Sequence, residues 1–258
     1  MALVATGDAC GYVVLGAIME EERFSRIELL VGQEGLERLR TAHCAVLGLG
    51  AVGSYAAEAL ARGGVGRLRL IDFDVVRPSN RNRQLYALES TLGLPKVDVA
   101  CRRVADINPD CEVEALREFV HVETLDLVLA GPPDVVIDAI DSFTQKVALL
   151  AAATARGIPV VSTMGAALRT DPSCVRVGPL HETSQCPLAK RVRKRLRLLG
   201  ASLDFPCVYS VEPVPPERCG AADVDDCGEE EHYPRGRERR PFGSLPTLTG
   251  IFGLTAAN

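Results

Sequence analysis

A glycine-rich turn at Gly48–Gly53 constrains the fold of this chain more than any other feature. It overlaps the end of an apolar run at 44–49 that has the length of a buried strand, and it leads into a predicted helix at 53–62. A strand that passes through a tight turn into a helix is the opening of a βαβ unit. Such units build parallel sheets, so the turn predicts an α/β protein.

The same alternation continues along the first two thirds of the chain. We predict strands at 44–49, 67–72, 112–116, 134–140 and 158–163, and helices at 23–40, 53–62, 96–108 and 143–156. The strands are mainly continuous apolar runs, as expected where helices cover both faces of a sheet. The predicted fold class is therefore α/β, a Rossmann-like, doubly wound, mostly parallel sheet with helices on both faces.

The chain outside this region is less regular. We predict helices at 187–199 and 245–257, and a loop at 213–241, which is rich in Pro, Gly and charges of both signs. Residues 1–22 are expected to be an irregular leader, and 23–258 to form one domain. The sequence shows no secretory signal and no stretch approaching the roughly 20 apolar residues of a membrane span. We therefore expect an intracellular, cytoplasmic protein.

Composition and cysteine usage exclude several classes. The 258 residues are 47% hydrophobic, with 23 Gly and 16 Pro, which excludes collagen-like and wholly disordered chains. The net charge of −5 does not indicate a nucleic-acid binder, although a local basic face can still exist. The nine cysteines form no CxxC pair, so we expect no zinc site. We expect mostly buried thiols, with Cys186 and Cys207 as the alternatives for a catalytic role.

The glycines of the turn suit a bound phosphate. Gly48, Gly50 and Gly53 let the chain turn tightly and let backbone amides approach a phosphate at the helix N-terminus. Asp72 ends the next predicted strand, 22 residues after Gly50, the distance at which an acid reaches ribose hydroxyls. Together these features predict an adenine-nucleotide site; the alternative is a glycine turn needed only for packing.

The residues that follow favour ATP over a dinucleotide. They are Asp74, Asn80, Arg83, Gln84 and Lys96. A dehydrogenase needs an acid for the ribose and an apolar slot for nicotinamide, but no fixed cations beside the phosphates. An enzyme that splits ATP between the α- and β-phosphates does need them, because negative charge builds on the departing pyrophosphate.

Two acids lie at the end of the strand predicted at 134–140. Asp141 stands where open α/β sheets place ligands, and we assign to it a Mg²⁺ ion beside the pyrophosphate. Asp138 is either a second functional acid or a simple strand-end residue.

Five motifs then point to a known family. They are GLGAVG, DFD, NRNRQ, GLPK and DAIDS, and in this order and spacing they resemble the ubiquitin-activating-enzyme-like adenylyltransferases over residues 23 to about 254. Within that superfamily the chain is most similar to the tRNA threonylcarbamoyladenosine dehydratases. The features that carry this similarity are RFSR at 23–26, Lys146 after DAIDS, STMGA at 162–166, PLAKRVRKRLR at 187–197, CVYSVEP at 207–213 and GSLPTLTGIFG at 243–253.

The resemblance implies an adenylation domain of the ThiF type with a site for ATP and Mg²⁺. It places Gly48, Gly50 and Gly53 in the phosphate loop, Asp72 at the ribose, and Asp74, Asn80, Arg83, Gln84 and Lys96 around the triphosphate. It gives catalytic roles to Arg26, Arg83, Lys96 and Asp141, with Asp141 as the Mg²⁺ ligand. Arg26 would reach across a homodimer to the partner's ATP, with Arg23 as the weaker candidate for that task.

The implied reaction is ATP-dependent dehydration of N6-threonylcarbamoyladenosine next to the tRNA anticodon. The threonyl carboxylate attacks the α-phosphate to give an acyl-adenylate and pyrophosphate, and a group of the same side chain then expels AMP and closes a ring. Tethering makes that second step favourable without an enzymic nucleophile. By the same analogy the partners are the modified tRNA, a second copy of the chain and a sulfur-relay protein. Relatives with a longer tail can be membrane-associated, so the mitochondrial outer membrane is the alternative location.

A cluster of cations on the helix predicted at 187–199 fits an RNA substrate. We assign RNA contacts to Lys190, Arg191, Arg193, Lys194 and Arg197, with Arg195 beside them, while Leu188, Val192, Leu196 and Leu199 form an apolar stripe. On a chain of net charge −5 such a concentration predicts contact with RNA phosphates. The alternative is a solvated charged face.

Three other functions are weighed against this hypothesis. Adenylation of a ubiquitin-like or sulfur-carrier protein is disfavoured by the missing CxxC pairs and by the basic helix. An NAD-dependent oxidoreductase would change nicotinamide absorbance and release no pyrophosphate. A non-catalytic nucleotide-binding module would not need Arg83, Lys96 and Asp141 together.

Overall fold

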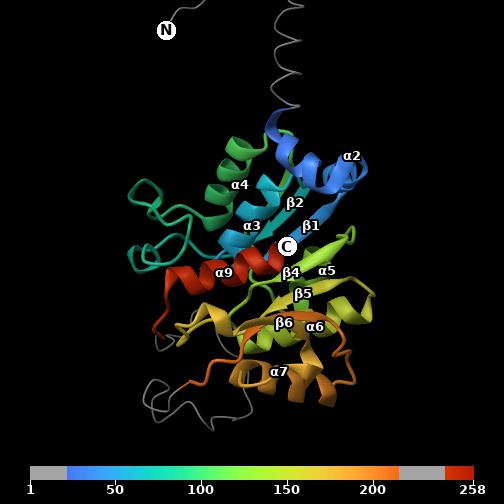
Figure 1. The fold of residues 1–258 in the computed structure, drawn as a ribbon. Helices are drawn as coiled ribbons and strands as arrows, with labels where there is room; N and C mark the ends of the chain where they lie inside the picture. Colours follow the sequence, from blue (N-terminus) through green and yellow to red (C-terminus); the bar gives the residue numbers. More distant parts are fainter. Residues whose placement is uncertain (1–21, 215–241) are drawn as a thin grey trace, which may run out of the picture.

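The computed structural model describes residues 22–214 and 242–258, which contain a seven-stranded sheet of order β3-β2-β1-β4-β5-β7-β6 (Figure 1). The strands are β1 (His43–Leu47), β2 (Arg67–Ile71), β3 (Glu112–Leu116), β4 (Val135–Asp138), β5 (Val160–Thr163), β6 (Val175–Pro179) and β7 (Pro206–Ser210). Neighbouring strands are parallel except β6 and β7. This sheet confirms the predicted fold class.

Helices connect most of the strands. They are α2 (Ser25–Thr41), α3 (Gly53–Arg62), α4 (Lys96–Ile107), α5 (Leu125–Val128), α6 (Phe143–Ala155), α7 (Pro187–Leu198) and α9 (Pro246–Ala257). Short 3-10 turns lie at Pro78–Asn80, Glu89–Thr91, Val122–Thr124, Pro172–Cys174 and Leu180–Glu182. In the part of the chain that the structure describes, no helix has both the length and the apolar character needed to span a bilayer.

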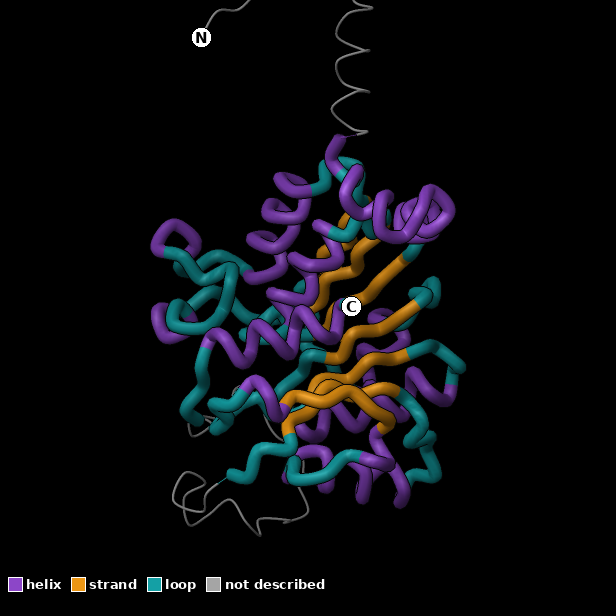
Figure 2. The backbone as a smooth tube through the Cα atoms, in the orientation of Figure 1, coloured by secondary structure: helices purple, strands orange, loops and turns teal. Residues whose placement is uncertain are grey.

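The helices form two layers around the sheet (Figures 1 and 2). Side chains of α3, α4 and α9 belong to one hydrophobic cluster, and those of α5, α6 and α7 belong to another. Because successive strand residues point to opposite faces, Val46 of β1 packs in the first cluster while Ala45 and Leu47 pack in the second. All three side chains are fully buried, which explains why the strands are continuous apolar runs.

The strand order reverses at β1, which pairs with β2 on one side and with β4 on the other. Such a reversal opens a crevice at the carboxyl ends of the strands, where α/β sheets bind ligands. Gly48 follows β1, Asp72 follows β2, and Asp141 follows the end of β4 by three residues. The topology therefore brings three distant parts of the sequence to one edge of the sheet.

The C-terminal helix α9 braces the helix that follows the glycine turn. A Cβ atom at Gly253 would lie 2.2 Å from the carbonyl oxygen of Val52, and one at Gly250 would lie 3.3 Å from the ring of Tyr55. Glycine at both positions therefore lets α9 approach α3 closely, and this contact supports the first turn of α3.

The predictions fail at an edge strand and within the first helix. The strand β6 was not predicted, because it lies at the sheet edge with Arg176 and Val177 exposed, and so lacks a continuous buried run. The first predicted helix is kinked in α2 at Gly32, whose φ of 75° is left-handed. The predicted leader at 1–22 and loop at 213–241 lie, except for their end residues, outside the described residues.

Candidate active site

The three glycines of the turn have different reasons to be glycine. Gly48 has a φ of 87°, and a Cβ there would lie 2.8 Å from the carbonyl oxygen of Ala139. A Cβ at Gly53 would lie only 1.7 Å from the carbonyl oxygen of Gly48. At Gly50 the nearest atom to a Cβ would be Nε2 of Gln84, at 3.8 Å. Packing thus demands glycine at 48 and 53 but leaves open space at 50, as expected where a ligand approaches the backbone.

Asp72 ties the glycine turn to the end of β2. Its Oδ2 atom accepts a hydrogen bond from the backbone N–H of Leu49 at 2.7 Å, and its Oδ1 atom accepts one from the N–H of Asp74 at 2.9 Å. Burial raises the pKa of the Asp72 carboxyl, and the nearby Lys96 ammonium opposes that rise. The carboxylate is therefore fixed against the glycine turn at the carboxyl end of β2, the position predicted for a ribose ligand.

Lys96 reaches the same place through a short backbone pairing. The segment 93–96 runs along residues 74–76, with hydrogen bonds from Val76 N to Leu94 O at 2.9 Å and from Lys96 N to Asp74 O at 3.0 Å. This pairing places Lys96, the first residue of α4, with its Nζ atom 3.1 Å from Asp74 Oδ2 and 3.8 Å from Asp72 Oδ2. The Lys96 side chain is only 6% exposed, so its ammonium is held beside these two carboxylates.

Asn80 and Gln84 belong to the turn that lies against the glycine loop. The Asn80 side chain accepts a hydrogen bond from Arg77 N at 3.0 Å, and its backbone oxygen accepts one from Gln84 N at 2.9 Å. Asn80 is almost fully buried and shapes the turn, whereas Gln84 presents its amide toward Gly50. The structure thus brings Gln84 to the phosphate loop and gives Asn80 a turn-building contact.

Arg83 lies on its own turn in this structure. Its Nη1 atom donates to Ser79 O at 3.0 Å and to Asn82 Oδ1 at 2.8 Å. The side chain is half-buried, and its contact with a triphosphate stays a prediction.

The two acids after β4 have different surroundings. Asp138 is fully buried, and its Oδ2 atom accepts hydrogen bonds from Lys146 Nζ and Ser162 Oγ, both at 2.6 Å. Its Oδ1 atom accepts one from the N–H of Ile140 at 3.1 Å. Asp141, by contrast, is exposed. Asp138 is therefore a structural acid, and Asp141 stays the predicted metal ligand.

An aromatic group that the sequence did not reveal lies beside Asp72. The rings of Phe73 and Phe119 meet edge to face with centroids 4.9 Å apart, and His121 lies 5.9 Å beyond Phe119. Phe73 is 42% exposed, so the group offers an apolar surface at the carboxyl ends of β2 and β3. Phe73 and Phe119 meet because β2 pairs with β3, and this pairing cannot be predicted from how far apart the two residues lie in the sequence.

Comparison with known proteins decides the family. The ThiF family model matches residues 24–258. The chain belongs to the ThiF family. It is 48% identical over 190 residues to the tRNA threonylcarbamoyladenosine dehydratase of Bacillus subtilis, an alignment that covers 74% of this chain and 75% of that protein.

Solved structures of a second bacterial protein share the fold of this ThiF family member. They are Escherichia coli tRNA N6-threonylcarbamoyladenosine dehydratase in complex with ATP and with AMP. The ATP complex matches with a TM-score of 0.79 and 36% identity, covering 92% of this chain and 91% of that one. The AMP complex matches with a TM-score of 0.80 and 34% identity, covering 99% and 94%.

Neither cysteine named as a catalytic alternative is placed for catalysis in this ThiF family chain. Cys207 lies fully buried in β7, where burial raises the pKa of its thiol to about 12. Cys186 is 5% exposed. Cys44 and Cys111 are also buried, and burial raises the pKa of each thiol to about 11. These four buried thiols are therefore not activated as nucleophiles, and Cys10, Cys219 and Cys227 lie outside the described residues.

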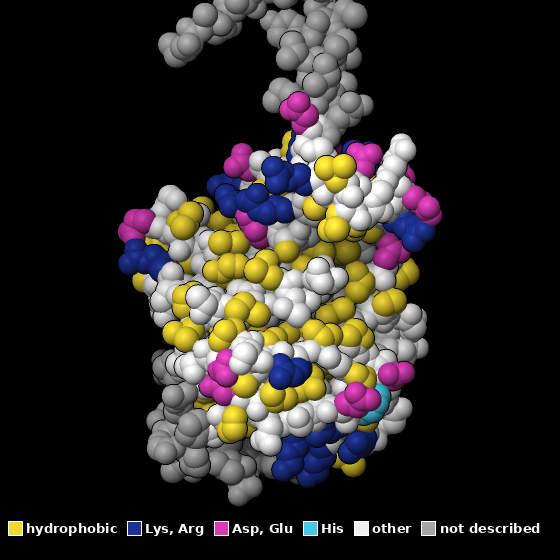
Figure 3. Space-filling view, viewed as in Figure 1, with side chains coloured by type: hydrophobic (Ala, Val, Ile, Leu, Met, Phe, Trp, Pro, Cys, Tyr) yellow, Lys and Arg dark blue, Asp and Glu magenta, His cyan; other side chains and the backbone are white. Residues whose placement is uncertain are grey.

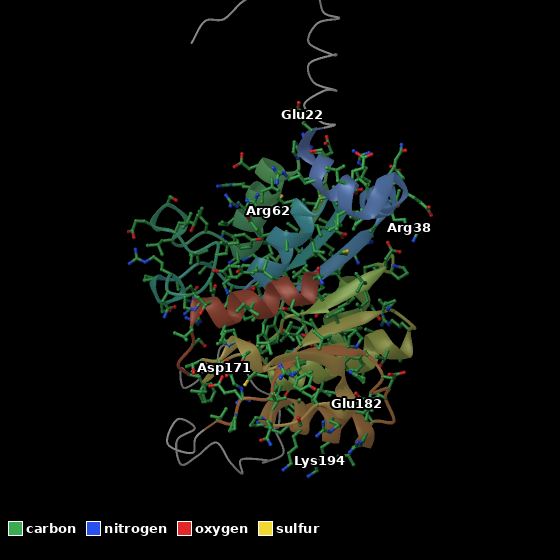
Figure 4. The ribbon with its side chains drawn as sticks, in the orientation of Figure 1. Glu22, Arg38, Arg62, Asp171, Glu182 and Lys194 are labelled. Atoms are coloured by element: carbon green, nitrogen blue, oxygen red, sulfur yellow. The ribbon has the colours of Figure 1, made fainter. Side chains whose placement is uncertain are left out.

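The basic helix α7 presents most of its cations to solvent. Ala189, Val192 and Leu196 are buried on its inner face, while Leu199, predicted to belong to the same stripe, is 53% exposed. Lys190, Lys194, Arg195 and Arg197 are exposed, and none of their side chains has a hydrogen bond or ion pair within residues 22–214 and 242–258. Figure 3 shows Lys and Arg side chains gathered at the end of the molecule where Figure 4 labels Lys194.

Two arginines of α7 are held by contacts within the chain. The Nη1 atom of Arg193 donates to the backbone oxygen of Thr183 at 2.7 Å and to its hydroxyl at 2.6 Å, so Arg193 anchors the turn before the helix. The guanidinium of Arg191 lies 4.6 Å from the ring centroid of Phe143, the first residue of α6. This cation–π contact joins the basic helix to the turn that carries Asp141.

The two arginines predicted for a partner's ATP also differ. Arg23 forms an ion pair with Asp110 at 2.5 Å and lies near Asn108 in its own chain, so its side chain is engaged locally. Arg26 is exposed, and its side chain has no ion pair or hydrogen bond in the described part of the chain. Nearby on the same helix, Leu29 and Leu30 are 88% and 83% exposed.

Proposed function

We propose that this chain catalyses the ATP-dependent dehydration of N6-threonylcarbamoyladenosine in tRNA, by adenylating the threonyl carboxylate and letting the side chain close on itself. The observation that carries the proposal is the grouping of the glycine loop, Asp72 and the buried Lys96 at one edge of the sheet, in a chain that aligns along nine tenths of its length with a dehydratase solved with ATP.

The residues at this edge divide the work of holding ATP. Open backbone at Gly50 gives the phosphates room to approach the N-terminus of α3, whose partial positive charge favours them. Asp72 would accept hydrogen bonds from the ribose hydroxyls, and the apolar group at Phe73 and Phe119 would lie against the base. Lys96 would place its ammonium against the phosphates as pyrophosphate departs, with Gln84 and Arg83 beside it.

A magnesium ion fits the donors that are present. No group of three or more His, Cys, Asp or Glu side chains within residues 22–214 and 242–258 is arranged to hold a metal ion by itself. Mg²⁺ commonly binds through one or two carboxylates together with substrate phosphates, and the exposed Asp141 offers one such carboxylate. When bound, the ion would neutralise charge on the pyrophosphate as it leaves.

The second half of the reaction needs no nucleophile from the protein. The activated carbonyl and the attacking group belong to one substrate side chain, so ring closure is intramolecular and strongly favoured. This matches a site in which the described thiols Cys186 and Cys207 are buried. The task of the protein is then to hold the adenylate until AMP is expelled.

The tRNA would lie on the basic face of α7, formed by Lys190, Lys194, Arg195 and Arg197. Their unpaired charges suit RNA phosphates, and binding would depend strongly on salt. Arg191 stacks on Phe143 and so links this face to the adenylation site. We assign to Arg193 the support of the helix, because its guanidinium is bonded to Thr183.

The chain would act as a homodimer in which Arg26 reaches the partner's ATP. The exposed Leu29 and Leu30 beside it support an interface on α2, and the local pairing of Arg23 leaves Arg26 as the candidate. Mixing Arg26→Ala protein with Asp141→Ala protein tests this arrangement. Activity in the mixture, with none in either variant alone, is expected; no recovery in mixed dimers would contradict a shared site.

Exchange of labelled pyrophosphate into ATP tests the adenylation step. Exchange is expected only when tRNA carrying threonylcarbamoyladenosine is present, because its carboxylate is the acceptor of AMP. Exchange that instead depends on a ubiquitin-like or sulfur-carrier protein would contradict the proposal. So would nicotinamide reduction without release of pyrophosphate.

A further inference from the structure

A buried ion pair lies directly beneath the turn that carries Asp141. Lys146 of α6 and Asp138 of β4 are both fully buried, with Lys146 Nζ 2.6 Å from Asp138 Oδ2. The same ammonium donates to the backbone oxygen of Thr163 at 3.0 Å and lies 3.5 Å from Ser162 Oγ. The three N–H bonds of a charged lysine therefore each have an acceptor, and the pair is satisfied without water.

The carboxylate of this pair also holds the turn above it. Asp138 Oδ1 accepts from the N–H of Ile140 at 3.1 Å, and Ser162 Oγ donates to Asp138 Oδ2 at 2.6 Å. The backbone of this turn also packs against the phosphate loop. Ala139 N donates to Leu47 O at 2.9 Å, and the Ala139 oxygen occupies the space that a side chain at position 48 would need. The position of the turn is therefore set jointly by β1 and by the buried pair.

The location of Lys146 gives it control over both ends of the turn. Its backbone N–H donates to Ser142 O at 2.9 Å, the first hydrogen bond of α6, while its side chain reaches back to the ends of β4 and β5. Residues 139–142 thus lie between two points fixed by one lysine. An apolar residue could fill the same volume, since buried ion pairs are often replaceable without loss of stability, but it could not hold Asp138 in place.

We propose that the Lys146–Asp138 pair is a positioning device for the Asp141 turn, and that it tunes the Mg²⁺ dependence of ATP binding without touching nucleotide or metal. The inference rests on the proposed adenylation site. It assigns Lys146 and Asp138 a role that neither the phosphate loop nor the ribose acid can supply, since those bind the nucleotide from β1 and β2.

The test compares three variants in direct binding assays. Asp138→Leu/Lys146→Met removes both charges and the acceptor for Ile140 N–H, whereas Asp138→Asn/Lys146→Met removes both charges but keeps an oxygen for it. Arg69→Met/Glu114→Leu is the control, because it deletes another ion pair of the sheet away from the turn. That pair joins the buried Arg69 to the half-buried Glu114, with Arg69 Nε 2.8 Å from Glu114 Oε2. AMP affinity without metal, Mg²⁺-dependent ATP affinity and thermal unfolding are measured for each.

We expect Asp138→Leu/Lys146→Met to fold and to bind AMP normally, while the Mg²⁺ concentration for half-maximal ATP binding rises roughly 10-fold or more, as when a support of a metal ligand is lost. The asparagine variant should recover most of that loss, and the control should resemble the wild-type chain. If the leucine variant does not fold, Ser162→Ala takes its place and should give a smaller rise in the same direction.

Three results would overturn the inference. They are unchanged Mg²⁺ dependence in the folded variants, an equal rise in the control, and a parallel loss of AMP and Mg²⁺-dependent ATP binding that marks a merely structural role. A wild-type chain whose ATP binding ignores Mg²⁺ would instead contradict the proposed metal site, so the two failures are distinguishable.

Discussion

The ammonium of Lys96 lies 3.1 Å from the Oδ2 atom of Asp74, a residue 22 positions earlier in the chain. This pair, with Asp72 beside it, holds a buried positive charge at the carboxyl edge of the sheet. We expect Lys96→Met to lower ATP–pyrophosphate exchange at least about 100-fold, because one group that stabilises developing charge is lost. Arg102→Met, which removes an exposed cation from the same helix, is the control. A loss of less than about 10-fold at Lys96 would contradict its role.

The same substitution should change how AMP binding depends on pH. Burial raises the pKa of Asp72, and the Lys96 ammonium lowers it, so removing that ammonium raises the pKa further. Ribose binding uses the ionised carboxylate. As the pH is lowered, AMP affinity should therefore begin to fall at a higher pH in Lys96→Met than in the wild-type chain. Isothermal titration calorimetry of AMP binding across the acidic pH range measures this shift. If AMP affinity falls at the same pH in both proteins, Asp72 does not bind the ribose.

Alanine substitutions at Gly50 and Gly53 should affect different properties, ATP binding in the first case and stability in the second. A methyl group at Gly50 has space in the protein, with Gln84 Nε2 3.8 Å away, so Gly50→Ala should fold normally and bind ATP weakly. A methyl group at Gly53 would lie 1.7 Å from the Gly48 oxygen, so Gly53→Ala should lower the unfolding temperature. Thermal unfolding and nucleotide binding of both proteins check this. Normal ATP affinity in Gly50→Ala would place the phosphates elsewhere.

Removing cations from α7 should weaken RNA binding and leave ATP binding unchanged. The variant is Lys190→Ala/Lys194→Ala/Arg197→Ala. If each side chain meets one phosphate, the slope of log affinity against log salt should become shallower by roughly two to three units. The control is Arg38→Ala/Arg62→Ala/Arg156→Ala, whose arginines are each paired with a carboxylate. Equal salt slopes in the two variants would rule out the basic face as the RNA site.

Cys207 should be unreactive in the folded protein. Burial raises the pKa of its thiol to about 12, so almost no thiolate exists near pH 8 and the reagent has no access. Alkylation followed by peptide mass analysis should modify the partly exposed Cys101 in the native chain and Cys207 only after unfolding. Cys207→Ala should retain pyrophosphate exchange. If a folded Cys207→Ala protein lost this exchange, Cys207 would have a catalytic role.

Local patterns were sufficient to predict the sheet and much of the nucleotide site. The apolar runs that became β1 and β4 carry their burial in the sequence itself, since both faces of the sheet are covered there. The sequence predicts Asp72 and Lys96 in one nucleotide site, and the structure brings the Lys96 Nζ atom to 3.8 Å from Asp72 Oδ2. The edge strand β6 lacks such a run, and its existence depends on pairing with β7.

Contacts between distant segments could not be predicted. Arg23, the weaker of the two arginine candidates, pairs with Asp110 across 87 positions, and this pairing engages its side chain within its own chain. Arg193 is bonded to the turn at Thr183, although its spacing in the helix resembles that of its solvent-exposed neighbours. Asp138 and Asp141 share one motif, and only the packing of Lys146 against β4 and β5 separates a structural acid from an exposed one.

We expect the glycine-loop crevice to use ATP to activate a carboxylate on tRNA. The most direct test of this activity is incubation of the chain with ATP, Mg²⁺ and tRNA carrying threonylcarbamoyladenosine, followed by digestion and mass analysis of the nucleosides. The expected product is a nucleoside lighter by one water, formed together with AMP and pyrophosphate by the wild-type chain and not formed by Lys96→Met. If the protein binds ATP but the mass of the modified nucleoside stays unchanged, the crevice does not catalyse this dehydration.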